Sequence, residues 1–299
     1  MAAGVLALGW AQGAMACNSG ASVSFSPQSP NVSWSPFPNG SQQTATITVT
    51  VSKGSNNNSA ATARVLILDT DTATPLRVGS LNGFPGPIYS MMGSIVSQVV
   101  NSSTPTTANS VVVNFQGSTG TATTTLTIAV NSAVEDFVSG SYSQATSYFV
   151  QCYNNGGNSM GAGVTGTGPT LNVSVPNLLQ VVTAGPQTID FGSFTSIAQS
   201  LAISLKSTGA INASVSTQNG NQMILTGAQS PVPANSTIPY NMTFDGQTVP
   251  AAGISLNNLS RAGVGGGNKS LVLTLPALPS GKLAGTYKDV ITLTLSPGT

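Results

Sequence analysis

The stretch Leu283-Ala-Gly-Thr-Tyr-Lys-Asp-Val-Ile-Thr-Leu-Thr-Leu295 lies near the end of the 299-residue chain and decides the fold. Within it, Ile291, Leu293 and Leu295 alternate with threonines. A period of two residues is typical of a β-strand that buries one of its faces. The stretch therefore predicts a last strand whose apolar face is turned toward a core.

The composition of the rest of the chain favours the same class. Charged residues make up 5% of the sequence, against about 25% in an average soluble protein. Low charge does not indicate disorder here, because 40% of the residues are hydrophobic and Val, Ile and Thr are abundant. The net charge of +1 gives no electrostatic reason to expect a nucleic acid as partner. We predict an ordered, all-β, extracellular protein.

The first residues are typical of an export signal. Met1 to Ala16 combine an apolar run with Ala14-Met-Ala16, a small-x-small cleavage pattern. Cleavage after Ala16 would leave Cys17 as the first mature residue, which also fits a lipoprotein. Ala14 argues against that alternative, because it stands where a lipobox usually has leucine.

Short strand-like runs separated by turn residues continue along the chain, without helical periodicity. Examples are Thr44–Ser52, Ser147–Tyr153 and Ser200–Leu205. Strands at this spacing suggest β-sandwiches. A Gly- and Asn-rich segment from Asn154 to Pro169 precedes a restart of the pattern. We predict two immunoglobulin-like β-sandwich domains, residues 17–174 and 175–299, after a signal peptide of residues 1–16.

The two cysteines, Cys17 and Cys152, are an even pair in a chain with an export signal. Such a pair predicts one disulfide. In the chain-entropy model, a bridge that closes so long a loop contributes about 4–5 kcal/mol.

Two short motifs resemble a known family. Leu283-Ala-Gly-Thr-Tyr287 resembles the entry to the final strand of spore coat protein U domains, a family that includes subunits of archaic, Csu-type chaperone–usher pili. Asp190-Phe-Gly192 resembles the segment after the first strand of these domains. The resemblance covers Val175 to Pro297. It implies that residues 175–299 form an incomplete pilin fold, one strand short, which a donor strand completes. The donor-strand groove would be lined by Leu179, Val181, Ile291, Leu293 and Leu295.

The resemblance also implies partners and a location. An adjacent pilin subunit would donate the strand, a periplasmic chaperone would occupy the groove first, and an outer-membrane usher would handle assembly. The protein would be exported through the periplasm to the cell surface. A mature chain that starts at Cys17, tied into its own domain, would have no segment to donate, which predicts a position at the pilus tip.

Two apolar clusters of the first domain are interrupted by Gly and Pro, which disfavour a central strand. We predict them as surface-binding loops, because exposed apolar patches on secreted proteins mark binding surfaces. The alternative, that both clusters fold back as lids on the sandwich, stays open. The candidate residues are Trp34, Phe37, Leu81, Phe84, Ile88, Tyr89, Met91 and Met92.

The sequence contains few side chains that could act in catalysis. The chain has no histidine, which excludes a Ser-His-Asp or Cys-His arrangement. Glu135 and Asp136 are adjacent, so on a strand they would face opposite ways. Asp69-Thr-Asp71 could supply calcium ligands, but a polar turn at a strand end is the simpler interpretation. Gly263-Val-Gly-Gly-Gly267 is expected to be a flexible hairpin. We predict no enzyme activity, no cofactor and no metal.

The function that these features favour is a tip adhesin of an archaic pilus, binding abiotic or host surfaces through the apolar loops. The alternative is a structural subunit of the pilus shaft, or of a spore coat or matrix, without adhesive activity.

Overall fold

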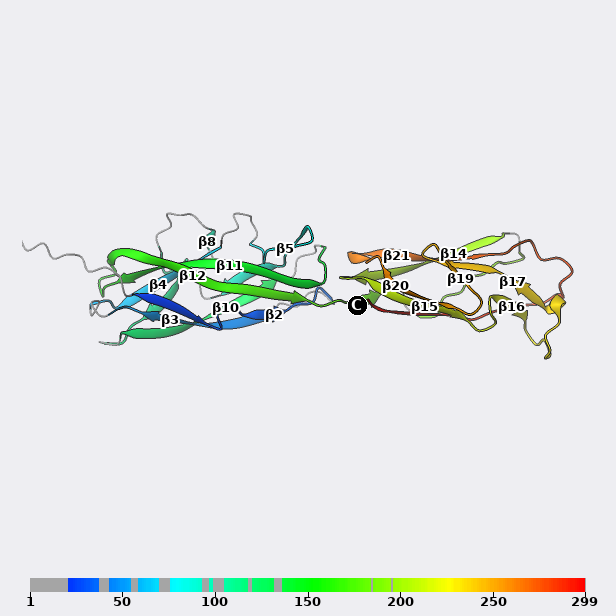
Figure 1. The fold of residues 1–299 in the computed structure, drawn as a ribbon, viewed down its shortest axis with the longest axis horizontal. Helices are drawn as coiled ribbons and strands as arrows, with labels where there is room; N and C mark the ends of the chain where they lie inside the picture. The colour runs from blue at the N-terminus through cyan, green and yellow to red at the C-terminus, as the bar shows by residue number, and fades with distance from the viewer. Residues whose placement is uncertain are drawn as a thin grey trace, which may run out of the picture. The chain divides into compact units, whose positions relative to one another are not determined.

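The computed structural model describes residues 21–37, 43–54, 59–69, 76–92, 97–98, 105–117, 120–131, 136–183, 185–194 and 196–298. This part of the chain is built of strands, with a single 3-10 turn, η1 (Ala234–Ser236) (Figure 1). The predicted all-β class is confirmed. Within these residues no helix has the length and hydrophobicity needed to span a membrane.

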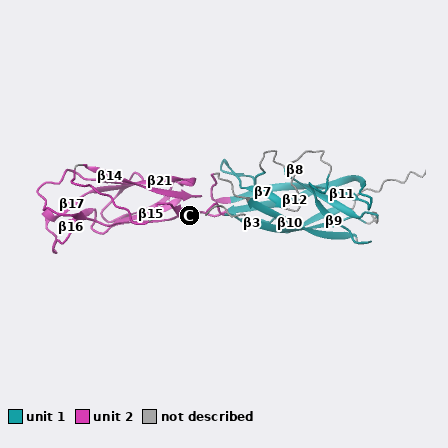
Figure 2. Ribbon diagram, turned by 180° about the vertical axis from the view of Figure 1, so that it is seen from behind, with its two compact units in different colours: residues 1–34, 42–132, 141–174 teal, residues 35–41, 133–140, 175–299 magenta. Residues whose placement is uncertain are grey.

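The chain divides into two compact units (Figure 2). Unit 1 contains residues 1–34, 42–132 and 141–174, and unit 2 contains residues 35–41, 133–140 and 175–299. Both units are β-sandwiches, as predicted.

Unit 1 consists of two main sheets and a small hairpin. The first sheet has the order β1 (Ser22–Ser26), β3 (Gln43–Ser52), β10 (Thr121–Asn131), β7 (Ile88–Met92). The second has the order β2 (Asn31–Ser33), β12 (Ser159–Val175), β11 (Gly140–Tyr153), β4 (Thr62–Asp69), β8 (Ser97–Gln98), and β9 (Val111–Asn114) also pairs with β4. The hairpin joins β5 (Ser80–Leu81) and β6 (Phe84–Pro85).

The core of unit 1 follows from alternation along its strands. In β3, Ile47, Val49 and Val51 are fully buried, while the threonines between them are turned outward or half-buried. In β12, Leu171, Val173 and Val175 are buried in the same way. The period of two places these apolar side chains on one face of their strand, between the sheets.

Unit 2 has one large and two small sheets. The large sheet has the order β13 (Leu179–Val181), β14 (Ala198–Ser207), β21 (Gly263–Thr274), β18 (Asn241–Phe244), β19 (Gln247–Val249). The second has the order β20 (Ile254–Leu259), β15 (Ile211–Thr217), β23 (Ile291–Pro297). The third has the order β17 (Thr237–Pro239), β16 (Gln222–Leu225), β22 (Tyr287–Lys288).

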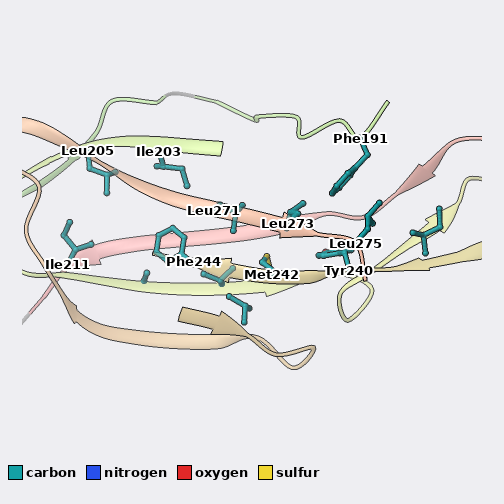
Figure 3. Packing of buried hydrophobic residues seen from close by; sticks show 14 residues of the cluster. Phe191, Ile203, Leu205, Ile211, Tyr240, Met242, Phe244, Leu271, Leu273 and Leu275 are labelled. Atoms are coloured by element: carbon teal, nitrogen blue, oxygen red, sulfur yellow. The ribbon is translucent and has the colours of Figure 1, made fainter. Parts of the chain in front are cut away.

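The core of unit 2 lies between the large sheet and the β20–β15–β23 sheet. Leu205, Ile211 and Phe244 are fully buried there. Figure 3 shows the side chains of Ile203, Leu205, Leu271 and Phe244 pointing into a common interior. The side chains of β23 are different, because Ile291, Leu293 and Leu295 pack against this core but stay half-buried.

Candidate functional site: an open groove in unit 2

The two units share a strand order, but one sheet has fewer described strands in unit 2 than in unit 1. In unit 1 the first sheet runs β1-β3-β10-β7, and in unit 2 the corresponding order is β13-β14-β21-β18. In the other sheet, the pair β11-β4 of unit 1 corresponds to β23-β15 of unit 2. Beyond β11, unit 1 adds β12 and then β2. The described residues of unit 2 contain no counterpart of β12 or β2, so β23 is an edge strand where β11 is a central one.

A groove of about 900 Å³ lies beside this edge. We call it the unit-2 groove. Its apolar lining comes from three strands, with Leu201 and Ile203 on β14, Leu271 and Leu273 on β21, and Ile291, Leu293 and Leu295 on β23. Val181, Thr183 and the segment from Gly185 to Phe191 line it as well, and Met223, Tyr240 and residues 286–290 complete the lining.

The half-burial of β23 follows from the groove. Ile291, Leu293 and Leu295 face the interior and no described strand covers them, whereas Thr292 and Thr294 are exposed on the opposite face. An apolar side chain that moves from such a position to full burial contributes about 1 kcal/mol, roughly half of what complete burial is worth. An edge strand with a free backbone and an apolar face also invites aggregation. The groove is therefore suited to receive an extended segment.

Four of the five residues predicted for a donor-strand groove line it: Val181, Ile291, Leu293 and Leu295. Leu179 does not, and packs against the core instead. The sequence reasoning missed the lining residues of β14 and β21. Their strands show the alternation that marks a buried face, but the pattern cannot reveal that part of this face is left uncovered.

Two polar residues of the groove lining, Tyr240 and Asp289, are hydrogen-bonded to each other near the start of β23. The Tyr240 hydroxyl donates to Asp289 Oδ2 at 2.7 Å, and Asp289 Oδ1 accepts the backbone N–H groups of Val290 at 2.8 Å and Asn219 at 3.1 Å. Burial, and then the neighbouring Asp289 carboxylate, raise the pKa of Tyr240 well above its ordinary value. This pair fixes the bend through which the chain passes from β22 into β23.

We expect Tyr240→Phe to destabilise unit 2 by about 1–3 kcal/mol, because a hydrogen bond to a carboxylate is lost. The raised pKa means that the neutral phenol is favoured in the folded state. This contribution is complete below the unfolded tyrosine pKa, about 10, and is lost as the pH rises through the higher folded value. Urea unfolding at several pH values should therefore show the difference between wild type and Tyr240→Phe shrinking above pH ~10.

Tyr287→Phe is the control, because its hydroxyl bonds only to the exposed carbonyls of Leu283 and Asn235. Parallel pH curves for wild type and Tyr240→Phe would contradict the assigned role.

Unit 1 carries a second candidate site, a hairpin formed by residues 77–88, which we call the apolar hairpin. Its strands β5 and β6 are joined by Asn82 and Gly83, whose φ angles of 51° and 81° are both positive. Two successive positive φ values are characteristic of the type I′ turn. Leu81 and Phe84 are directly opposite each other across the hairpin, so their half-buried side chains lie on one face.

Buried hydrogen bonds hold the base of the apolar hairpin. The Asp69 carboxylate is fully buried and accepts from the Tyr89 hydroxyl and from Gln144 Nε2, the latter at 2.6 Å. Gln144 Oε1 accepts the N–H of Gly79 at 3.2 Å. A Cβ atom on Gly86 would lie 2.0 Å from the Val78 carbonyl oxygen, so only glycine fits there. Asp69 thus has a structural role as a hydrogen-bond acceptor; Asp71 lies outside the described residues.

The structure corrects three of the eight residues predicted for surface-binding loops. Trp34, Tyr89 and Met91 are 1%, 2% and 6% exposed, so they belong to the core. The segment that contains Tyr89 and Met91 is β7, which pairs with β10 despite the Gly and Pro residues before it. The others are half-buried: Phe37 after β2, Leu81 and Phe84 in the hairpin, and Ile88 on β7. Met92 ends β7; its side chain lies outside the described part of the structure.

Cys152 is buried and disulfide-bonded; Cys17, its predicted partner, lies outside the described residues. Within the described ranges, no three His, Cys, Asp or Glu side chains are grouped so that they could hold a metal ion. The expected hairpin at Gly263–Gly267 is instead the beginning of β21, which pairs with β14 through a bulge.

Comparison with solved structures gives weak likenesses over most of the chain. One is to the CsuC–CsuE chaperone–tip adhesion subunit pre-assembly complex of archaic Csu pili from Acinetobacter baumannii, with 13% identity, a TM-score of 0.40, and 92% of this chain and 99% of that chain covered. Another is to the CupB6 tip adhesin of Pseudomonas aeruginosa, with 13% identity, a TM-score of 0.36, and coverages of 94% and 95%. A third is to the enterotoxigenic E. coli adhesin CfaE, with 10% identity, a TM-score of 0.39, and coverages of 91% and 92%.

No family model and no curated protein sequence matches the chain. At these levels of identity and structural agreement the likenesses assign the chain to no family.

Proposed function

We propose that this protein is the tip adhesin of an archaic chaperone–usher pilus, anchored to its fibre through unit 2 and binding surfaces through unit 1. The observation that carries the proposal is the unit-2 groove. Unit 2 repeats the order of the first sheet of unit 1 and its β11–β4 pair, and no described strand of unit 2 stands where β12 does in unit 1. A strand from another chain would complete it.

The groove has the two features that strand addition needs. The edge of β23 supplies main-chain hydrogen-bonding groups, and the apolar lining accepts side chains at alternate positions of an extended segment. Main-chain bonds then give affinity and the side-chain sites give specificity. An adjacent pilin subunit would donate this strand in the fibre. Before assembly a periplasmic chaperone would cover the same edge, and an outer-membrane usher would exchange the two, so that the protein would be displayed at the cell surface.

Unit 1 would be the binding domain, because its sandwich already contains β12, which has no counterpart among the described residues of unit 2. The apolar hairpin supplies half-buried Leu81 and Phe84 on one face and an exposed Pro85. Its base is held by the Asp69 network, so the side chains are presented on an ordered backbone. Apolar groups held in this way suit contact with an abiotic or host surface.

A structural subunit of the pilus shaft, or of a spore coat or matrix, is the second candidate. The observation that favours it is the burial of Trp34, Tyr89 and Met91, which reduces the apolar surface available for adhesion. The two candidates share the groove and differ in what unit 1 does.

The groove is tested by titrating the full chain with a synthetic peptide. We use the sequence Thr-Val-Thr-Ile-Thr-Val-Thr, flanked by lysines for solubility, and call it the test peptide. Calorimetry or fluorescence anisotropy should show saturable, one-to-one binding. A scrambled peptide with its apolar residues adjacent should not bind. Absence of binding by the test peptide would contradict the proposal.

The adhesive role predicts the effect of a double substitution in the apolar hairpin. Leu81→Ser with Phe84→Ser should weaken adsorption to a hydrophobic surface about thirtyfold, because each half-buried side chain contributes about 1 kcal/mol. Binding of the test peptide should be unchanged. Leu278→Ser removes an equally apolar side chain that is 54% exposed in unit 2 and outside the groove, and serves as the control. Equal adsorption of all variants would favour the structural candidate.

A further inference from the structure

Along β23, the backbone N–H and C=O groups point alternately toward β15 and away from it, in step with the side chains. Val290 O accepts the N–H of Gln218 at 2.9 Å, and the N–H of Gly298 donates to Ala210 O at 2.7 Å. Between these two bonds, the register with β15 is regular from Ile291 to Pro297. In an antiparallel ladder the bonded pairs recur every second residue. Residues of even number, such as Thr292 and Thr294, therefore bond to β15.

The residues of odd number direct their backbone groups to the free edge. These are Ile291, Leu293 and Leu295, the same residues whose side chains line the groove. No described strand pairs with this edge. The same three residues thus supply the free backbone groups and the apolar side chains. A strand that pairs with these backbone groups must also fit its side chains into the groove.

The free edge has two defined ends. Pro297 has the same phase as Leu295 and is exposed, but proline has no N–H to donate. Beyond it, Gly298 is buried and its carbonyl accepts from Asn177 Nδ2 at 2.6 Å. At the other end, Tyr287 and Lys288 pair with β16, and Asp289 accepts the N–H of Val290. The pairing edge therefore offers three N–H donors, at Ile291, Leu293 and Leu295.

We propose that Pro297 fixes the register of the inserted strand, and that the groove selects a segment with three apolar residues at alternate positions whose own amides form the bonds to β23. This inference rests on the proposed strand insertion. The orientation follows from unit 1, where β12 fills the equivalent position as the second arm of the β11–β12 hairpin. In antiparallel pairing, each inserted residue opposite Ile291, Leu293 or Leu295 exchanges two backbone hydrogen bonds with it. The side chain of the same inserted residue points into the groove.

The first test is an N-methyl scan of the test peptide against the full chain. N-methylation at each apolar position removes a donor and leaves a β23 carbonyl without its bond, so the affinity should fall at least about fivefold. N-methylation at the threonines between them should have a smaller effect. The reason is that the backbone groups of these threonines would face the groove wall opposite β23. That wall forms no strand between Gly185 and Asp190, and Pro186 has no N–H to donate. Larger losses at the threonines would overturn the inference while leaving strand insertion intact.

The second test asks whether Pro297 sets the end of the ladder. The test peptide is lengthened by Thr-Val at its amino end, which would lie opposite Pro297. The wild type should gain little affinity from the extra residues. Pro297→Ala restores an N–H donor and should gain at least about fivefold more from them. Pro276→Ala, an exposed proline outside the groove, is the control and should behave like wild type.

Equal gains in wild type and Pro297→Ala would overturn the role of Pro297. If no form of the peptide binds, the proposed function fails before the question of register arises.

Discussion

Replacing Leu293 with lysine is expected to weaken binding of the test peptide at least about a hundredfold, because strand insertion would bury an unpaired charge. In the free chain Leu293 is half-buried and lines the open groove, so a lysine there can extend its ammonium group into water. The variant should therefore fold. Binding, measured by the same titration, is the property that should change.

Thr292→Lys is the matched control. Thr292 lies on the same strand, next to Leu293, and its side chain is exposed on the opposite face. It should bind the test peptide within about threefold of wild type, a difference below 1 kcal/mol. Equal losses in both variants would show that charge on β23 matters and not the groove, and equal retention would show that the peptide binds elsewhere.

The second large effect concerns stability. Fusing the test-peptide sequence after Thr299 through a short Asn-Gly-containing turn should let β23 and the added strand form a hairpin, as β11 and β12 do in unit 1. Burial of three apolar side chains and the new main-chain bonds, less the entropy of ordering the strand, should stabilise unit 2 by about 2–4 kcal/mol. The fused chain should also stop binding added test peptide.

Denaturant unfolding followed by a probe in each unit measures this gain. The transition of unit 2 should shift, while that of unit 1 should stay where it was. The same fusion in the Leu293→Lys background supplies the control, because the strand can no longer enter the groove. A fused chain without added stability, which still binds external peptide, would contradict the claim that a strand equivalent to β12 completes unit 2.

The open edge could be predicted from sequence because its signal is local. Ile291, Leu293 and Leu295 alternate with polar residues over one strand, and this pattern defines a face without reference to other elements. Leu201 and Leu271 lie in strands with the same alternation, but their place in the groove depends on which strand is missing above them. That is a property of sheet order, which one strand's pattern does not contain.

The errors in unit 1 have a physical reason as well. Pro85, Gly86 and Pro87 predict a loop, and the chain does form a turn-rich hairpin there. Tyr89 nevertheless enters β7 directly afterwards, because its backbone pairs with Val130 and its hydroxyl finds the buried Asp69. Long-range pairing outweighs the local preference, as it does at Gly263, where β21 pairs with β14 despite its glycines.

Hydrogen exchange of the β23 amides in the full chain tests the central claim most directly. In the free protein, protection from exchange should alternate along β23. The amides of Thr292 and Thr294 should be protected by β15, and those of Ile291, Leu293 and Leu295 should exchange rapidly. Saturation with the test peptide should then protect all five. Amides of Ile291, Leu293 and Leu295 that are already protected in the free chain, or that stay unprotected when the peptide is bound, would contradict an open edge completed by a donated strand.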